Sequence, residues 1–534
     1  MKRKTSCRMV LLITLFLIAL SASSQVLNEG TYKIGRTFGL IDAFYVDSAD
    51  LDKLAEKAII EILKNLDPHS TYISAKDVKE MNEPLNGNFE GIGIQFNLLR
   101  DSIIIIEPIA GGPSEKVGLR AGDRILTINQ EKVTGIGIST TGVRSRLMGA
   151  KGTKVNITVF RRGEKDILDF TIIRDKIPIN SLDASYMLDK ETGYIKLNKF
   201  AATTEKEFSD AVAVLKKSNM KNLVLDLRGN GGGYMLAATT IADKFFSDQK
   251  LLVYLSGRKT PRQDYKSSGI GSLSSARVVV LTDEGSASAS EILAGALQDW
   301  DRGVILGRRT FGKGLVQNGF NLTDGSMIRL TIARYYTPSG RSIQSSYNEG
   351  YDKYMENFLK RFTLHGEMMT ADSTHFLDSL KSKTLVNKRV VYGGGGIMPD
   401  VFVAADTTYN TAYFSRLNGK NVLSSFTVEY YDKNRLKLNS QYKSFDEFKN
   451  EFQFSPDDIK TFIAKGEAEG VKYNEDQFNK SKDEILLVLK GLVATNIWQP
   501  SEYFQIINEN DKVIEKALNV ISDKKSYNTI LGNQ

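Results

Sequence analysis

Cysteine and histidine are scarce in this sequence of 534 residues, with one and three copies respectively. Cys7 lies in a segment that we expect to be cleaved off, so the remaining chain has no disulfide, thiolate metal site or cysteine nucleophile. None of the histidines (His69, His365 and His375) is close along the chain to the serine-rich segment at 286–290. Histidine is the usual base for a serine hydroxyl. A nucleophilic serine in that segment is therefore more economically paired with a lysine.

Long basic blocks are also missing. The formal net charge is +8, and four of the positive charges fall within the first 24 residues, at Lys2, Arg3, Lys4 and Arg8. The remaining charges of both signs are dispersed, which gives little support to nucleic-acid binding.

The first 24 residues have the pattern of a signal peptide. The four basic residues precede a short apolar run, Met9–Leu20, and then the small residues Ser21–Ser24. This order predicts cleavage before Gln25, and the run is too short for a comfortable membrane span. We therefore expect an exported protein of the periplasm or cell envelope, with no stable membrane span.

The rest of the chain is long enough for several domains. Residues 25–87 are predicted to be an N-terminal helical segment, because apolar residues recur at helical spacing between Leu51 and Leu63. It ends in a turn at Leu66–Tyr72, where His69 is interpreted as an ordinary turn residue after Pro68. Residues 176–409 alternate apolar runs with helical patterns, as an α/β core does. The apolar runs Leu223–Leu227, Val278–Leu281 and Val304–Leu306 are predicted to be its buried strands.

Two further parts carry no assigned role. A charged, helix-prone insertion is predicted at about 346–390, inside the α/β core. Residues 410–534 are predicted to form a mostly helical extension, with a β-like piece at Ser424–Tyr431 and helices near 446–466, 476–495 and 501–522.

Residues 88–175 have short β-like runs separated by glycine-containing turns. Gly91-Ile92-Gly93-Ile94 opens this unit, and Gly118-Leu119-Arg120-Ala121-Gly122-Asp123 follows. Both segments resemble hallmarks of a PDZ domain. The resemblance implies that Ile92, Gly93 and Ile94 form the loop that binds the carboxylate of a peptide terminus. Ordinary turn chemistry would also explain a glycine pair in a hairpin, but two hallmarks at suitable spacing favour the PDZ interpretation.

A strand–turn–helix pattern places Ser288 at the start of a predicted helix. Unpaired N–H groups and the positive end of the helix dipole collect there, which suits a developing oxyanion. Ser288-Ala289-Ser290-Glu291 also fits a capping box, so Ser288 alone is explained as well by a helix cap.

Thr310-Phe311-Gly312-Lys313-Gly314 supplies a candidate base. A phosphate loop would need Ser or Thr where this chain has Gly314, so a nucleotide site is disfavoured. A lysine base must be neutral, and burial lowers its pKa. Gln317 is placed to accept a hydrogen bond from the amine, and the glycines of Asp226–Gly233 provide N–H groups and close approach.

These segments together resemble the carboxyl-terminal processing (tail-specific) peptidases of the Ser-Lys type. Leu66-Asp67-Pro68, Tyr335–Ile343 and Gly396-Ile397-Met398-Pro399-Asp400 add to the match. The resemblance implies a Clp-protease/crotonase-like α/β core, with Ser288 as nucleophile, Lys313 as base and Gln317 as orienting residue. It also implies an oxyanion hole at Gly232 and Ala289. Asp299 matches a family position, but eleven residues of helix separate it from Ser288 by about 16 Å, so we predict structural support at the helix end.

The expected activity is that of an exported serine endopeptidase that recognises the C-terminal tail of protein substrates and cleaves near it. No metal, nucleotide or organic cofactor is implied, and a homo-oligomer or an adaptor is a possible partner. Two alternatives stay open: a non-catalytic peptide-binding protein on a protease-like scaffold, and acyl transfer or hydration of a thioester, which fold analogy alone suggests.

Overall fold

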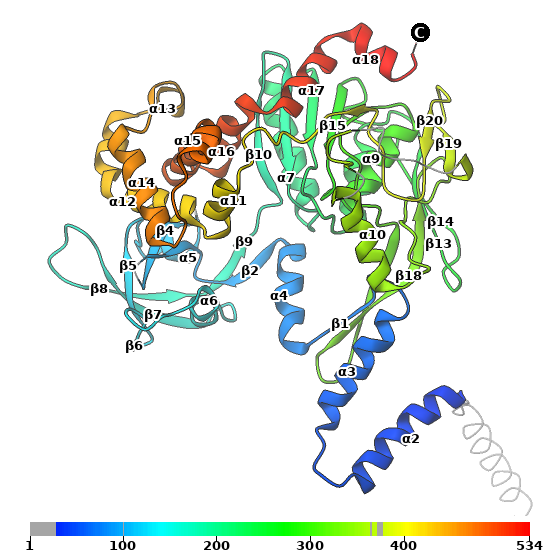
Figure 1. The fold of residues 1–534 in the computed structure, drawn as a ribbon, viewed down its shortest axis with the longest axis horizontal. Coiled ribbons are helices and arrows are strands. Elements are labelled where there is room, and N and C mark those ends of the chain that lie inside the picture. The colour runs from blue at the N-terminus through cyan, green and yellow to red at the C-terminus, as the bar shows by residue number, and fades with distance from the viewer. Residues whose placement is uncertain (1–27, 100, 110, 364–365, 371–377, 534) are drawn as a thin grey trace, which may run out of the picture.

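The computed structural model describes residues 28–99, 101–109, 111–363, 366–370 and 378–533. The predicted signal peptide lies outside these residues. Figure 1 shows an α/β core, a β-rich domain, a helical extension above that domain, and N-terminal helices that project away from the rest. The predicted multidomain α/β architecture is confirmed.

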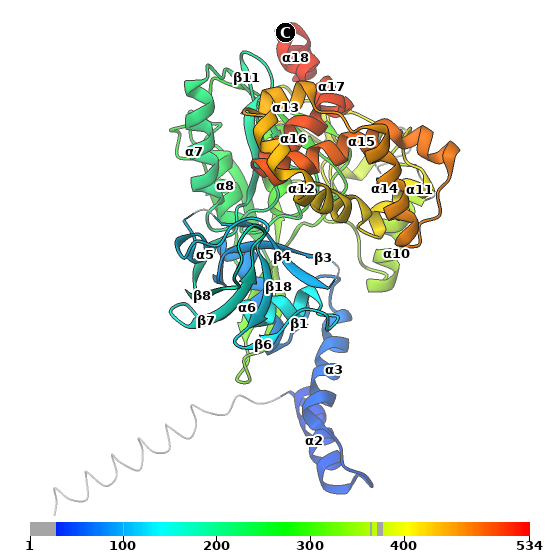
Figure 2. The same ribbon diagram turned by 90° about the vertical axis from the view of Figure 1, so that its left-hand side faces the viewer.

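The N-terminal segment is helical as predicted, with one short strand. Its elements are α2 (Glu29–Phe44), α3 (Leu51–Lys64), β1 (Thr71–Ile73) and α4 (Ala75–Asn86). Asn28, Asp50 and Ser74 accept hydrogen bonds from the first turns of the three helices, as N-caps do. No residue of α2 is buried, and Figure 2 shows α2 and α3 extending away from the body of the protein.

The β-rich domain is built on a six-stranded antiparallel sheet in the order β3-β4-β5-β7-β8, with β6 paired to β5. A separate pair, β2 and β9, leads into and out of it. The elements are β2 (Asn88–Gly91), β3 (Ile94–Leu99), β4 (Ser102–Pro108), α5 (Pro113–Lys116), β5 (Arg124–Ile128), β6 (Glu131–Lys132), α6 (Thr140–Leu147), β7 (Lys154–Phe160), β8 (Leu168–Ile173) and β9 (Asp175–Pro178).

The core is organised around a six-stranded sheet in the order β10-β11-β12-β15-β16-β21. All neighbours are parallel except β10, which runs antiparallel to β11. The three predicted strands are confirmed as β12 (Asn222–Asp226), β15 (Arg277–Thr282) and β16 (Val304–Gly307). The sheet also contains β10 (Leu182–Met187), β11 (Thr192–Leu197) and β21 (Val401–Phe402).

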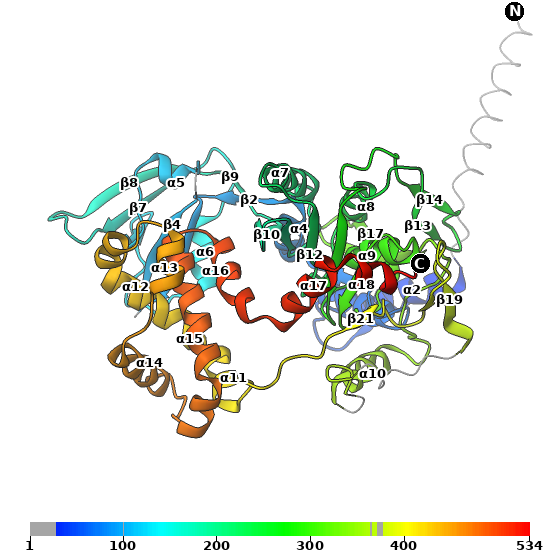
Figure 3. The same ribbon diagram turned by 90° about the horizontal axis from the view of Figure 1, so that it is seen from above.

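Both faces of this sheet are covered by helices. Because side chains alternate along a strand, Leu223 and Leu225 face the first layer, whereas Val224 faces the second. The first layer is α7 (Thr204–Lys217), α8 (Met235–Asp243) and α9 (Ala289–Asp299); the second is α17 (Lys512–Ser522), with α18 (Lys524–Ile530). Figure 3 shows α17 and α18 lying over the core.

A second sheet carries the rest of the core, in the order β1-β18-β13-β14, with β17 also paired to β18. Its members from the core are β13 (Leu251–Ser256), β14 (Gln263–Lys266), β17 (Leu315–Asn321) and β18 (Met327–Tyr336). The insertion contributes α10 (Tyr351–Thr363), a 3₁₀ turn (Asp378–Leu380) and the hairpin β19 (Lys381–Lys383) and β20 (Val390–Tyr392).

The extension before α17 consists of α11 (Ala412–Gly419), α12 (Val422–Gln441), α13 (Phe445–Glu451), α14 (Pro456–Ala468), α15 (Glu475–Ile497), α16 (Pro500–Ile507) and a 3₁₀ turn (Asn508–Asn510). It touches the β-rich domain, where Asp432 on α12 accepts from Arg124 at 3.3 Å and Arg435 donates to the carbonyl of Ala121. None of the described helices is both long enough and apolar enough to cross a membrane.

Three predictions for the extension were wrong. The helix predicted at 501–522 is two helices, α16 and α17, separated by the 3₁₀ turn at Asn508–Asn510. Ser424–Tyr431 is not β-like but lies inside α12, because Phe426 and its neighbours pack against α11, α14 and α15, and this packing outweighs their β-propensity. The helix predicted at 446–466 is two helices. The break is set by Ser455, which caps α14, and by Pro456, which is well tolerated at a first helical position.

Candidate active site

Ser288 stands on a sharp turn between β15 and α9. Its φ of 56° and ψ of −110° are unusual for a residue other than glycine. The turn before it is held by Ser286, whose hydroxyl donates to the carbonyl of Leu227 at 2.8 Å. Since strained conformations persist only where the surroundings enforce them, the position of Ser288 is strongly determined by the fold.

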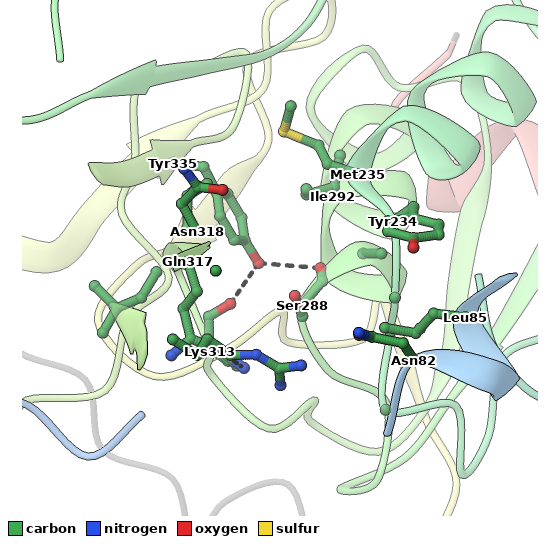
Figure 4. A pocket seen from close by; sticks show the side chains of 18 of the residues that line it. Asn82, Leu85, Tyr234, Met235, Ser288, Ile292, Lys313, Gln317, Asn318 and Tyr335 are labelled. Carbon is green, nitrogen blue, oxygen red and sulfur yellow. Dashed lines mark hydrogen bonds between the residues drawn. The ribbon is translucent and has the colours of Figure 1, made fainter. Parts of the chain in front are cut away.

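One cavity of about 520 Å³ brings the five predicted core-site residues together. Its wall includes Ser288, Ala289, Gly232, Lys313 and Gln317. Figure 4 labels three of them, Ser288, Lys313 and Gln317. Ser288 and Ala289 lie at the start of α9, and Gly232 lies in the glycine-rich loop that follows β12. Lys313 lies in the loop between β16 and β17, and Gln317 lies on β17. Asn82 and Leu85 of α4 also line it, so the N-terminal segment contributes to the site.

The Lys313 amine lies 3.2 Å from Oε1 of Gln317 and donates a hydrogen bond to it. The Gln317 amide in turn donates to the backbone carbonyl of His69, which fixes the amide with its oxygen toward the lysine. Burial lowers the pKa of Lys313, and the positive charge of Arg329 lowers it further. No described hydrogen bond joins this amine to the Ser288 hydroxyl; such contacts often tighten only when substrate is bound.

His69 itself confirms the predicted turn, but its backbone enters the site in a way that the sequence did not suggest. Asp67 accepts from the N–H groups of His69 and Ser70 at 2.8 and 2.9 Å, and from Thr331 on β18 at 3.0 Å. The His69 ring has its pKa lowered to about 4 by burial and by the charge of Lys313. His365 and His375 lie outside the described residues.

Gly232 packs tightly against the turn that carries Ser288. A Cβ on this residue would lie 2.9 Å from Cβ of Ser288 and 3.0 Å from N of Ala289, and its φ is +99°. Only glycine fits such an approach. The Gly232 N–H donates to Oδ1 of Asn230 at 2.9 Å in this conformation, whereas the Ala289 N–H belongs to the first turn of α9, where N–H groups have no partner within the helix.

Two buried residues that sequence reasoning did not assign to the site tie its halves together. The Glu291 carboxylate accepts from the N–H groups of Ser288, Gly312 and Lys313 at 2.7–2.9 Å, and burial raises its pKa to about 7. The Tyr335 hydroxyl lies 3.1 Å from the carbonyl oxygen of Ser288 and 2.6 Å from that of Lys313 (Figure 4, dashed lines). The capping-box pattern gave a signal for Glu291. Tyr335 begins the segment Tyr335–Ile343 that adds to the family resemblance, but no role was assigned to it.

Asp299 lies at the far end of α9 and is fully buried. It pairs with Arg341 at 2.7 Å and accepts from the Ser339 N–H at 2.9 Å. The predicted structural role at the helix end is confirmed.

Ile92, Gly93 and Ile94 line a different groove, of about 380 Å³, in the β-rich domain. Phe96 on β3 and Leu147 on α6 form its apolar walls, and Arg144 on α6 adds a positive charge. Gly93 has a φ of +73°, and a Cβ there would lie 2.8 Å from Ile177. This groove suits an apolar peptide end that carries a carboxylate.

Replacing Arg329 by methionine should move the acidic limb of the kcat/KM profile to higher pH. A lysine that acts as base is active when neutral, so activity rises as pH passes through its pKa, and removal of a neighbouring positive charge lets that pKa rise. The measurement is the pH dependence of peptide cleavage, the activity that the family resemblance implies. Arg329→Lys keeps the positive charge, so its acidic limb should lie at the same pH as in the wild type. An acidic limb that is also unchanged in Arg329→Met would show that the limb does not report the ionisation of Lys313.

No group of three or more described His, Cys, Asp or Glu side chains is arranged to hold a metal ion.

Comparison with known proteins gives three family matches: Peptidase family S41 over residues 191–350, a PDZ domain over 91–172 and a family of unknown function (DUF8443) over 413–499. The chain is 34% identical over 360 residues to the carboxy-terminal processing protease CtpA of Bacillus subtilis, covering 64% of this chain and 76% of that one. It is 38% identical over 341 residues to the carboxy-terminal-processing protease of Bartonella bacilliformis, covering 61% and 77%. The solved photosystem II D1 C-terminal processing protease is 31% identical, with a TM-score of 0.35 and coverage of 59% and 84%. The chain thus belongs to the carboxy-terminal processing proteases, serine-type peptidases that join an S41 core to a PDZ domain.

Proposed function

We propose that this protein is an exported endopeptidase that recognises the C-terminal tail of protein substrates and cleaves near it with a Ser-Lys dyad. The observation that carries the proposal is the single cavity that is lined by both Ser288 and Lys313, whose partly buried amine is hydrogen-bonded to Gln317. A lowered lysine pKa increases the neutral fraction that can accept a proton.

In this mechanism the neutral Lys313 amine takes the proton of the Ser288 hydroxyl as Oγ attacks the scissile carbonyl. Gln317, held by the His69 carbonyl, orients the amine. The Ala289 N–H at the start of α9 stabilises the oxyanion, together with an N–H of the glycine loop around Gly232. The lysinium then protonates the leaving amine, and water releases the acyl group from Ser288.

Substrate choice would come from the PDZ groove, where Ile92, Gly93 and Ile94 hold the terminal carboxylate and Leu147 contacts an apolar last side chain. Export is supported by the pattern of residues 1–24, and N-terminal sequencing of the mature protein should begin at Gln25.

The test compares two unfolded substrates that differ only at the end of the chain, one with a free apolar terminus and one ending in two aspartates. Mass spectrometry should find the first trimmed near its C-terminus, with kcat/KM roughly tenfold or more above the second, because burying one apolar side chain is worth about 1.5–3 kcal/mol. Equal cleavage of both, or cleavage of neither, would contradict tail recognition.

A further inference from the structure

The insertion at 346–390 contacts the lysine loop, here defined as residues 308–314. Arg361, near the end of α10, is 7% exposed. Its guanidinium donates to three successive carbonyl groups of the loop, those of Arg309 at 3.3 Å, Thr310 at 3.0 Å and Phe311 at 3.1 Å. An arginine that donates to three consecutive carbonyl groups, one of them buried and two partly buried, determines the path of that backbone.

Aromatic packing reinforces the contact. The rings of Phe311 and Phe358 lie 4.7 Å apart, and Phe358 lies 5.1 Å from Phe362 on the next turn of α10. Earlier on the same helix, Tyr354 packs edge-on against His69 at 5.7 Å. The insertion thus reaches both the lysine loop and the turn that holds Gln317.

The opposite side of the loop is held by Glu291, which accepts from the Gly312 and Lys313 N–H groups and from the Thr310 hydroxyl at 2.6 Å. Carbonyl groups bonded to Arg361 and N–H groups bonded to Glu291 fix the loop from two sides. Glu367 anchors Arg361 in turn, at 3.0 Å, and also pairs with Arg309 at 2.6 Å. Lys313 lies within this fixed segment, two residues after the last carbonyl that is bonded to Arg361.

We infer that Arg361 is a positioning residue of the peptidase: through the carbonyl groups of residues 309–311, α10 of the insertion sets the place of the Lys313 amine. The inference rests on the proposed role of Lys313 as base. It assigns a function to a segment whose sequence gave none, and it makes the insertion part of the catalytic apparatus.

The consequence of losing Arg361 follows from the geometry. Without it, the loop relaxes, the amine moves away from Gln317 and becomes more hydrated, and its neutral form is less favoured. Four charged or titratable groups face this amine from the neighbouring elements: Arg329 on β18, Glu291 on α9, and Asp67 and His69 before β1. These groups remain in the variant, so a change in the pH profile reports on the position of the loop.

The experiment measures kcat/KM for peptide cleavage from neutral to alkaline pH in Arg361→Met, with Lys360→Met as matched control. Lys360 is the preceding residue of α10 and pairs with the exposed Glu356. Arg361→Met should lose roughly 10- to 100-fold at neutral pH, mainly in kcat, because small displacements of a reacting group are costly. Its acidic limb should move to higher pH, so that much of the loss is recovered there. Arg361→Lys, which keeps a donor, should lie between wild type and Arg361→Met.

The outcomes separate two failures. If Lys313→Ala and Ser288→Ala retain activity, the proposed dyad is wrong and the inference falls with it. If Lys313→Ala and Ser288→Ala both abolish activity, but the acidic limb of the kcat/KM profile lies at the same pH in Arg361→Met as in Lys360→Met, only the inference is wrong. If circular dichroism shows that Arg361→Met does not fold, Arg361→Lys takes its place. An acidic limb at the same pH in Arg361→Lys as in Lys360→Met then overturns the inference, and a limb at higher pH supports it.

Discussion

Replacing Ser288, the proposed nucleophile, by alanine is expected to lower kcat/KM for tail cleavage by about 10⁴-fold or more, since covalent catalysis is lost while binding and the proposed oxyanion site remain. Ser288 stands on a strained turn at the start of α9 and lines the same cavity as Lys313. The variant should still fold, because alanine keeps the backbone N–H group at position 288, which donates a hydrogen bond to the Glu291 carboxylate. Cleavage kinetics and labelling by a serine-directed covalent probe measure the effect.

Ser209→Ala is the matched control, since Ser209 lies on α7 and its hydroxyl bonds only to Glu205 among the described contacts. It should keep wild-type turnover and labelling. A Ser288→Ala protein that cleaves within tenfold of wild type would exclude this serine as the nucleophile. A wild-type protein that binds apolar tails but neither cleaves them nor takes the probe would favour the non-catalytic binding alternative.

The residues that the sequence could predict are those whose chemistry is local. Ser288 stands in a strand–turn–helix pattern, and Lys313 and Gln317 are four residues apart, so each could be found within a short window. The residues that it could not predict act across long separations. Arg361 reaches the carbonyl of Phe311 across 50 residues, and Tyr335 bridges two loops through backbone atoms that leave no trace in the side-chain pattern.

The same distinction applies to the fold. The buried strands of the core are continuous apolar runs, as parallel strands covered on both faces should be, and they were predicted. The helices that cover each face of the sheet were not predicted. The second layer comes from the last helices of the chain, α17 and α18, more than 200 residues after β16. Nothing in the apolar stripe of α17 says which surface it packs against.

That second layer leads to the prediction with the largest effect on stability: a chain ending at Gln499 should fail to fold. The truncation removes α16 to α18 and exposes the sheet face that carries Val224, Val279 and Leu281. Each buried aliphatic side chain contributes about 1.5–3 kcal/mol, and at least eight lose their cover or are deleted, whereas domains have only about 5–15 kcal/mol of net stability. We expect aggregated protein without a cooperative thermal transition.

Point variants test the same idea without removing a segment. Ile514 on α17 is 2% exposed against the sheet, so Ile514→Ala should cost about 2–5 kcal/mol in the free energy of unfolding. Lys516, two residues along the same helix, is exposed, and Lys516→Ala should change stability by less than about 0.5 kcal/mol. Denaturant unfolding of the full chain measures both. Equal stabilities for the two variants, or a truncated chain that melts like the wild type, would mean that α17 is not part of the core. One face of the central sheet packs against α17, and the opposite face packs against α9, the helix that begins after Ser288. The expected result therefore makes residues 500–534 a structural layer of the peptidase.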